Sequence, residues 1–153
     1  MSKRSVIHET IVVERGYGAP IERTFAAFAQ AQERARWDVP DEGWEVTELI
    51  EEFRVGGRER SRFGPKGDPR YFSDGLYLDI QPNARIITAG TMHDRDVRMT
   101  CTLATLEFYP SARGTRLILT DQSVYFGAEK PTDRRGGWGT ILDNLERHVE
   151  GKH

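Results

Sequence analysis

The sequence predicts an α+β fold in which a curved antiparallel sheet of about seven strands packs against one long C-terminal helix. Strand-like stretches follow one another through short turns rich in Gly, Pro, Asn and Asp, which favours antiparallel pairing. Two short helical stretches interrupt this pattern after the first strand. The last twenty-odd residues form an amphipathic helical pattern, and such a helix needs a surface to pack on because it is only marginally stable alone in water.

The closing helix is expected within residues 131–153. Pro131, Thr132 and Asp133 are residue types that start a helix, and Gly151 is a residue type that ends one. Between them, an apolar stripe recurs at helical spacing opposite a polar side: Trp138, Ile141, Leu142, Leu145 and Val149. We expect this stripe to face the sheet.

Three glycines in the first half of this helix, Gly136, Gly137 and Gly139, are unusual because each costs about 1 kcal/mol relative to alanine. One interpretation is that the missing side chains leave room for a ligand beneath this half of the helix, with Trp138 as a wall. The alternatives are close backbone packing, or a helix that starts later than Pro131.

The remaining elements follow from β-branched, alternating and helical patterns separated by turn residues. Short helices are expected at residues 20–29 and 31–37, followed by a loop at 38–43. Strands are expected at residues 9–15, 46–53, 58–63, 71–80, 85–93, 97–109 and 115–125. No linker or repeat divides the chain, so we expect a single domain over residues 1–153.

Composition narrows the class of protein. The formal charge is −2, from 22 basic and 24 acidic residues without a one-signed region, which argues against nucleic acid or an anionic membrane as a partner. No apolar run reaches the length that spans a bilayer. The single cysteine, Cys101, fits a reducing compartment, and the N-terminus lacks the apolar core of a signal peptide. We therefore expect a cytoplasmic protein.

The alternating stretch at residues 58–63 indicates which side of the sheet faces inward. Arg58, Arg60 and Arg62 share one face, and three unpaired guanidinium groups are very costly to bury. Glu59, Ser61 and Phe63 are therefore expected to face the interior beneath the helix. There Glu59 is a polar anchor in a binding cavity, part of a structural ion pair, or at an edge position open to water.

Other strands suggest further inward-facing residues. Val97, Met99, Cys101 and Leu103 alternate, and we expect that face to look inward. Met92 and His93 end the preceding strand and are also candidates. A Glu59–His93 acid–base pair remains open if both side chains line the cavity.

Motifs for other chemistry are missing. The four histidines lie too far apart for metal-ligand spacing, so no metal site is expected. The sequence has neither a phosphate-binding Gly-rich loop nor a nucleophile elbow. We therefore assign no catalytic residue and expect no cofactor.

Several motifs in order resemble the activator-of-Hsp90-ATPase-homologue family of the START-like (SRPBCC) superfamily. Residues 19–28 (A-P-I-E-R-T-F-A-A-F) resemble its first helix, and R-W at 36–37 precedes its first loop. Residues 53–59 resemble its "G-G-x" strand entry, and residues 75–82 with 85–87 its "G-x-Y-x-E-I-x-P-x-x-R-I-V" hairpin. Residues 114–122 (G-T-R-L-I-L-T-D-Q) and G-W at 137–138 resemble its last strand and closing helix. Asp38 and Asp121 depart from the family pattern, which has Trp and Glu there.

The resemblance implies a helix-grip (START/Bet v 1-like) fold, whose curved sheet and C-terminal helix enclose an apolar cavity. We expect this cavity to bind a small hydrophobic or amphipathic ligand. Combined with the patterns above, the expected lining is Trp37, Glu59, Ser61, Phe63, Met92, His93, Met99, Leu119, Trp138, Ile141 and Leu142. Alternative functions are activation of an Hsp90-type chaperone partner and a cyclase- or lyase-like reaction in the same cavity. Homodimerisation is common enough in such folds to be expected as well.

Overall fold

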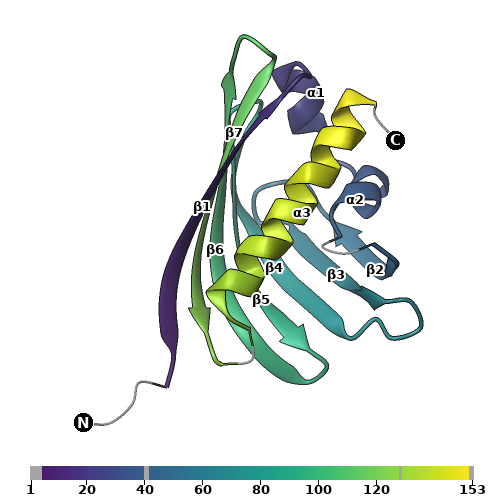
Figure 1. Ribbon diagram of the computed structural model, residues 1–153, viewed down its shortest axis with the longest axis vertical. Coiled ribbons are helices and arrows are strands. Elements are labelled where there is room, and N and C mark those ends of the chain that lie inside the picture. The colour runs from purple at the N-terminus through teal and green to yellow at the C-terminus, as the bar shows by residue number, and fades with distance from the viewer. Residues whose placement is uncertain (1–4, 40–41, 128, 152–153) are drawn as a thin grey trace.

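The computed structural model describes residues 5–39, 42–127 and 129–151, which form a curved sheet and three helices (Figure 1). In chain order these are β1 (Ile7–Tyr17), α1 (Ile21–Ala26), α2 (Ala31–Trp37), β2 (Trp44–Glu51), β3 (Arg58–Pro65), β4 (Tyr71–Gln81), β5 (Arg85–Asp94), β6 (Val97–Pro110), β7 (Thr115–Tyr125) and α3 (Pro131–Glu150). The predicted helix-grip α+β fold is confirmed. None of the described helices is long and apolar enough to cross a membrane.

The sheet has the strand order β1-β7-β6-β5-β4-β3-β2, and every neighbouring pair is antiparallel. The first and last strands therefore lie side by side, and β1 and β2 are the two edges. Register shifts interrupt the pairing in β2, in β4 and between β5 and β6. Such bulges add local twist and bend the strands, which helps the sheet to curve around α3.

The bulge between β5 and β6 corrects one expectation about which side chains face inward. Met92 pairs with Thr100 and His93 with Arg98, so Met99 is the extra residue on β6. The alternation reverses at this point. Thr100 and Ala104 are buried, whereas Val97 and Leu103 on the predicted inner face are exposed, so the expected inner face of β6 is wrong except at Met99.

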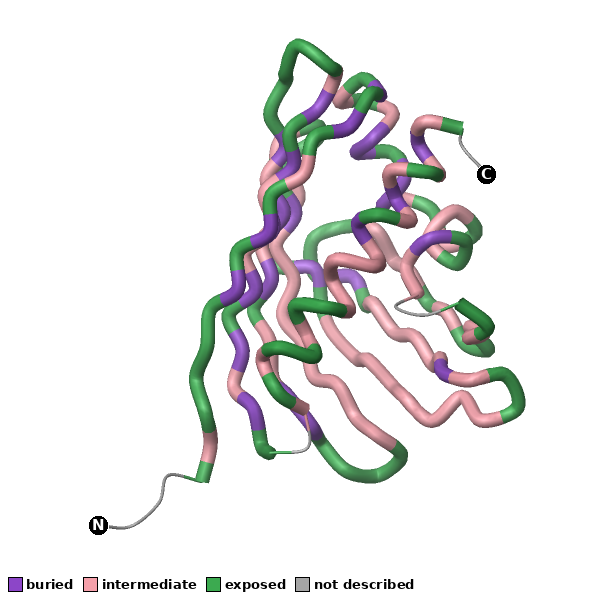
Figure 2. The backbone as a smooth tube through the Cα atoms, in the orientation of Figure 1, coloured by how far each residue is buried: buried purple, intermediate pink, exposed green. Residues whose placement is uncertain are grey.

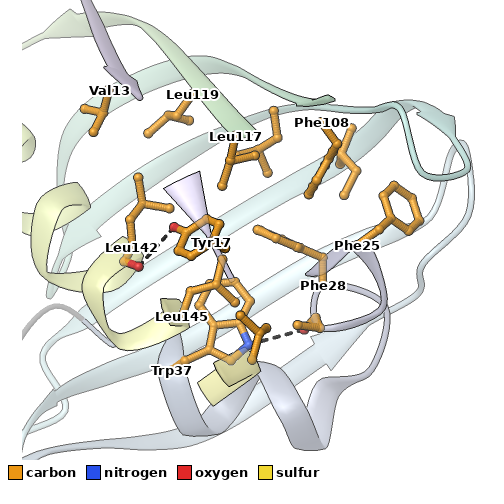
Figure 3. Close-up of a cluster of buried hydrophobic side chains, with 14 of the residues drawn as sticks. Val13, Tyr17, Phe25, Phe28, Trp37, Phe108, Leu117, Leu119, Leu142 and Leu145 are labelled. Carbon is orange, nitrogen blue, oxygen red and sulfur yellow. Dashed lines mark hydrogen bonds between the residues drawn. The ribbon is translucent and has the colours of Figure 1, made fainter. Parts of the chain in front are cut away.

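The hydrophobic core lies beneath the C-terminal half of α3, at the end of the sheet covered by α1 and α2 (Figures 1 and 3). Leu142 and Leu145 are fully buried there, and Val149 nearly so. They belong to one cluster with side chains from β1, α1, α2, β6 and β7, among them Tyr17, Phe28, Trp37, Phe108, Leu117 and Leu119. The buried Tyr17 hydroxyl donates to the Leu142 backbone carbonyl at 3.0 Å, which satisfies a polar group that would be costly to bury unpaired.

The N-terminal half of α3 is packed differently from the C-terminal half. Its residues are half-buried or exposed, as are most residues of β3, β4 and β5 below it (Figure 2). The helix begins at Pro131, where the Asp133 carboxylate accepts from the Lys130 backbone N–H at 3.1 Å, and it ends at Gly151 with a left-handed φ of 70°. A later start therefore does not explain the helix glycines.

The sheet beneath this half of α3 contains a cross-strand glycine pair, Gly75 on β4 and Gly90 on β5. A Cβ on Gly75 would lie 2.8 Å from the Ala89 carbonyl oxygen, and one on Gly90 would lie 2.5 Å from that of Asp74. Both distances are too short for any side chain. The close approach of these two strands therefore requires glycine at both positions.

Replacement by alanine should change the free energy of unfolding in opposite directions for a helix glycine and a sheet glycine. A Cβ on Gly136 would meet no atom within 4 Å, so Gly136→Ala should raise the free energy of unfolding by about 0.5–1 kcal/mol through helix propensity alone. Gly75→Ala should lower it by at least about 1 kcal/mol because of the backbone collision. Chemical denaturation followed by circular dichroism measures both. A destabilised Gly136→Ala would show that close packing does occur at this position.

Candidate functional site

A cavity of about 730 Å³ lies between the N-terminal half of α3 and the concave face of the sheet. Residues of α2, of strands β2 to β6 and of α3 line it. Gly136 and Gly137 are among them, so the part of the helix that lacks side chains faces the cavity. Gly136 and Gly137 therefore agree with room beneath the helix, whereas Gly139 does not line the cavity and a Cβ there would lie 3.6 Å from Arg15 Nη2.

The floor of the cavity consists of small residues on the middle strands of the sheet. Gly75, Ala89, Gly90 and Ala104 lie on β4, β5 and β6 and all line the cavity. Gly75, Gly90 and Ala104 lie on the face toward the helix, where they leave the space free, whereas Ala89 points to the opposite face because it is the neighbour of Gly90 in the strand. The depth of the cavity thus follows from side-chain size as well as from the curvature of the sheet.

The walls are aromatic and aliphatic. Trp44, Phe63 and Tyr71 form an aromatic wall at the open ends of β2, β3 and β4, with the Trp44 and Tyr71 rings stacked at a centroid distance of 5.2 Å. The Phe63 ring lies 5.8 Å from that of Tyr71. Apolar side chains from β5, β6 and α3 complete the lining: Met92, Met99, Trp138 and Ile141.

One end of the cavity contains a buried arginine among acidic residues, here called the Arg34 cluster: Arg34, Asp38, Glu51, Glu59 and Tyr77. The Arg34 guanidinium donates to Asp38, to Glu59 Oε1 at 2.9 Å and to the Tyr77 hydroxyl at 3.2 Å. Tyr77 in turn donates to Glu51. Arg34 of α2 and Asp38 directly after this helix thus meet side chains of β2, β3 and β4 around a single cation.

The acidic side chains of the Arg34 cluster outnumber the cation, and burial shifts the pKa values of two of them. Burial raises the pKa of Glu51 to about 7 from its ordinary 4.5, and the nearby charges of Arg34 and Glu59 act in opposite directions on it. Burial likewise raises the pKa of Glu59. Burial alone would lower the pKa of the Arg34 guanidinium, but the three carboxylates outweigh this effect and raise it. Arg34 is therefore always charged.

A second group, here called the Asp121 cluster, ties α3 to the sheet: Asp121, Ser123, Glu129, Arg134, Trp138, Thr100 and Thr102. Asp121 on β7 is completely buried, and its Oδ2 accepts from Arg134 Nε and from Trp138 Nε1, each at 2.7 Å. Arg134 also donates to Glu129 and to both threonine hydroxyls of β6. Every nitrogen of this guanidinium is thus bonded to the protein. Among the residues with described positions, no group of three or more His, Cys, Asp or Glu side chains is arranged to hold a metal ion.

The structure brings seven of the eleven residues expected from the sequence into the lining of this cavity: Glu59, Ser61, Phe63, Met92, Met99, Trp138 and Ile141. The orientation of β3 predicted from its three arginines is therefore correct. Arg60 and Arg62 lie on the other face, where both guanidinium groups stack over the Phe72 ring at about 5 Å from its centroid.

Three of the expected residues are core residues and do not line the cavity. Trp37 is 1% exposed, and its indole N–H donates to the Ala27 carbonyl at 3.2 Å. Leu119 and Leu142 are fully buried in the same hydrophobic cluster. All three lie at the end of the molecule where side chains of the hydrophobic cluster fill the space between the helices and the sheet.

His93 also lies outside the cavity. It follows Met92 in a strand, so the two side chains point to opposite faces, and His93 lies beside Phe72 on the outer face, with ring centroids 6.0 Å apart. The Glu59–His93 acid–base pair is therefore ruled out by geometry.

Sequence reasoning missed the two arginines and most of their partners. Arg134 could have been found, because it lies four residues before Trp138 and so extends the same helical stripe. Glu51 follows the inward-facing Leu49 by two residues, which places it on the same face of β2. The burial of Arg34 depends on how α2 sits against the sheet, and no periodicity in the sequence reports that.

Removing the charge at the centre of the Asp121 cluster should destabilise the protein strongly. Asp121→Asn leaves Arg134 without its closest counter-charge, and we expect a loss of about 2–4 kcal/mol in the free energy of unfolding. Asp143→Asn is the matched control, because Asp143 forms an exposed ion pair with Arg15 at 3.4 Å and should change stability by less than about 0.5 kcal/mol. Equal effects of the two changes in urea unfolding would contradict this role for Asp121.

The raised pKa of Glu51 predicts a specific pH dependence of stability. A carboxyl group whose folded pKa lies above its unfolded value holds its proton more tightly in the folded state, so its contribution is complete below the unfolded pKa of 4.5 and is lost as pH rises toward about 7. Glu51→Gln keeps an acceptor for Tyr77 and removes this titration. The variant should therefore be more stable than the parent at pH 8, by on the order of 2 kcal/mol, and lose less stability between pH 4.5 and 7. Parallel curves for parent and variant, from thermal unfolding at a series of pH values, would contradict the prediction.

Comparisons with known proteins agree with this geometry. An uncharacterized protein from Rhizobium leguminosarum is 34% identical, with a TM-score of 0.89 over 99% of this chain and 100% of that one. A protein from Rhizobium loti is 37% identical, with a TM-score of 0.85 over 95% and 99% of the two chains. An AHSA1-like protein from Aeromonas hydrophila, at 23% identity, shares the fold with a TM-score of 0.75 over 94% and 93%. None of the curated proteins matched.

The family comparison covers nearly the whole chain. The model described as "Activator of Hsp90 ATPase homolog 1-like protein" matches residues 18–150. This range runs from just before α1 to the end of α3 and includes both polar clusters and the cavity lining. The chain therefore belongs to the activator of Hsp90 ATPase homolog 1-like family, within the START-like (SRPBCC) superfamily.

Proposed function

We propose that this protein binds a small amphipathic molecule in the cavity between α3 and the curved sheet. One observation carries the proposal: aromatic and aliphatic side chains form the walls of a cavity of about 730 Å³. The two arginines of its lining, Arg34 and Arg134, belong to two separate polar clusters. Pockets for small organic molecules typically have this volume and this combination of apolar walls with a few polar groups.

The proposal also accounts for features that packing does not require. Ser61 and Ser73 face each other across β3 and β4 and line the cavity, where larger apolar residues would fill the space. Trp138 has its indole N–H fixed by Asp121, so its ring is held in one orientation beside the empty volume. A wall that is fixed in advance reduces the entropy lost when a ligand binds.

A variant that fills the cavity tests the proposal. Nile red, a neutral dye that fluoresces strongly in apolar surroundings, is the probe. Ser61→Phe places an aromatic ring between Phe63 and Glu59 and should weaken Nile red binding at least about fivefold, whereas Ser61→Ala, which adds no bulk, should stay within about twofold of the parent. Fluorescence titration gives the affinities, and circular dichroism checks that both variants fold. Nile red that binds Ser61→Phe as tightly as the parent does not occupy this cavity, and the proposal then fails.

Activation of an Hsp90-type chaperone ATPase is a second candidate, favoured by the description of the family to which the chain belongs. This function requires an exposed surface that contacts the chaperone and makes no use of the cavity. An unchanged ATPase rate of the host's Hsp90-type chaperone on addition of this protein would remove the candidate.

A further inference from the structure

We propose that the ligand of this cavity is an organic cation, with an amine group held by the carboxylates of the Arg34 cluster and an apolar, preferably aromatic body against the aromatic wall. The inference rests on the proposed function and adds the charge and shape of the ligand. The cavity and its aromatic wall exist independently of the acidic groups, so the two observations are separate.

The cavity lining is strongly acidic. Among the described residues, two arginines and five acidic side chains face it, a formal charge of −3. The acidic residues are Asp38, Glu51, Glu59, Glu129 and Asp133, because Asp74, which also borders the cavity, pairs with Arg60 on the outer face. Such a charge excess in a partly enclosed, low-dielectric space attracts cations and repels anions.

Neither arginine is available to bind an anionic ligand. The Arg34 nitrogens donate to Asp38, Glu59 and Tyr77, and those of Arg134 donate to Asp121, Glu129 and the threonines of β6. A ligand carboxylate would have to displace a carboxylate of the protein from either guanidinium. The charged groups that could recognise a fatty acid are therefore already occupied.

The carboxylates, in contrast, retain free capacity on the cavity side. The side chains of Glu59 and Asp38 are 21% and 27% exposed, and within the described part of the chain Glu59 uses only Oε1 for a hydrogen bond. Glu51 is 1% exposed and lies behind them, bonded to Tyr77. An ammonium group beside Glu59 would donate to its second oxygen and also stabilise the ionised form of Glu51.

The spacing of charge and aromatic rings sets the size of the ligand. Phe63 and Glu59 point to the same face of β3 four residues apart, which corresponds to roughly 13 Å along the strand. Ser61 lies between them and leaves the path open. An amine separated from an aromatic ring by a chain of about six carbons spans this distance, with its ring on Phe63, Trp44 and Tyr71.

Three probes of equal shape and different charge test the inference: phenylhexylamine, phenylhexanol and phenylhexanoate. Isothermal titration calorimetry at pH 8 should show the amine binding about tenfold or more tightly than the alcohol, and the carboxylate binding most weakly. Glu59→Gln should weaken the amine about tenfold and leave the alcohol within about twofold. Glu48→Gln is the matched control, because Glu48 pairs with Arg62 at 3.0 Å on the outer face, and it should leave all three affinities unchanged.

The pH dependence provides an independent readout. The groups that face Glu51 are Arg34 and Asp38 from α2 and its end, Glu59 from β3 and Tyr77 from β4. Because burial raises the pKa of Glu51 to about 7, binding of a cation should release a proton near neutral pH. The affinity for the amine should rise between pH 6 and 8 while that for the alcohol stays constant.

The outcomes separate the two proposals. Equal affinities for the three probes, or a preference for the carboxylate, would overturn the cation and leave the cavity as a binding site. Binding of none of the probes would overturn both proposals. If Glu59→Gln fails to fold, Asp38→Asn takes its place, and the ranking of the probes on the parent protein remains decisive.

Discussion

The cavity depends on a single buried carboxylate, Asp121. Arg134 and Trp138 lie one turn apart on α3 and both donate to Oδ2 of Asp121, so two long side chains span the distance between the helix and β7. Nearer the C-terminus, Leu142 and Leu145 lie in the hydrophobic core with no polar spacer. The same helix is therefore held away from the sheet at one end and packed onto it at the other. Two apolar side chains in place of this cluster would favour direct contact between the helix and the sheet, because that contact would bury apolar surface.

The fold could be predicted from the sequence because its signals are local. Strand alternation, turn residues and the apolar stripe of α3 each depend on a few neighbouring residues, and they gave the order and approximate bounds of every element. The face of a strand that points inward was predictable where the other face carried several charges, as in β3 with its three arginines. It failed in β6, where the extra residue Met99 reverses the alternation. A bulge of this kind depends on the partner strand, so the strand's own sequence does not reveal it.

The site was less predictable for a related reason. The stripe on α3 identifies residues that face the sheet, but it does not distinguish contact with the sheet from a position above empty space. Trp138 and Leu142 belong to the same stripe, and only the first lines the cavity. The distinction comes from the residues opposite. Gly75, Gly90 and Ala104 lie below the open half of the helix, whereas Leu117, Leu119 and Phe108 fill the closed half. Side-chain volume across the two layers, taken jointly, decides where a cavity forms.

Three features that reduce stability coincide at this cavity, and none is required by the fold. Glycines in the first half of α3 lower its helix propensity, buried carboxylates in excess of Arg34 are costly to ionise, and the empty volume forgoes the packing that supports protein interiors. Among the described residues, the opposite end of the molecule differs, since the buried residues of its helix are apolar and its aromatic rings are in edge-to-face contact. Natural chains tolerate local conflicts with stability mainly where function requires them. Their concentration beside one pocket therefore supports a binding role on physical grounds that are independent of the family relationship.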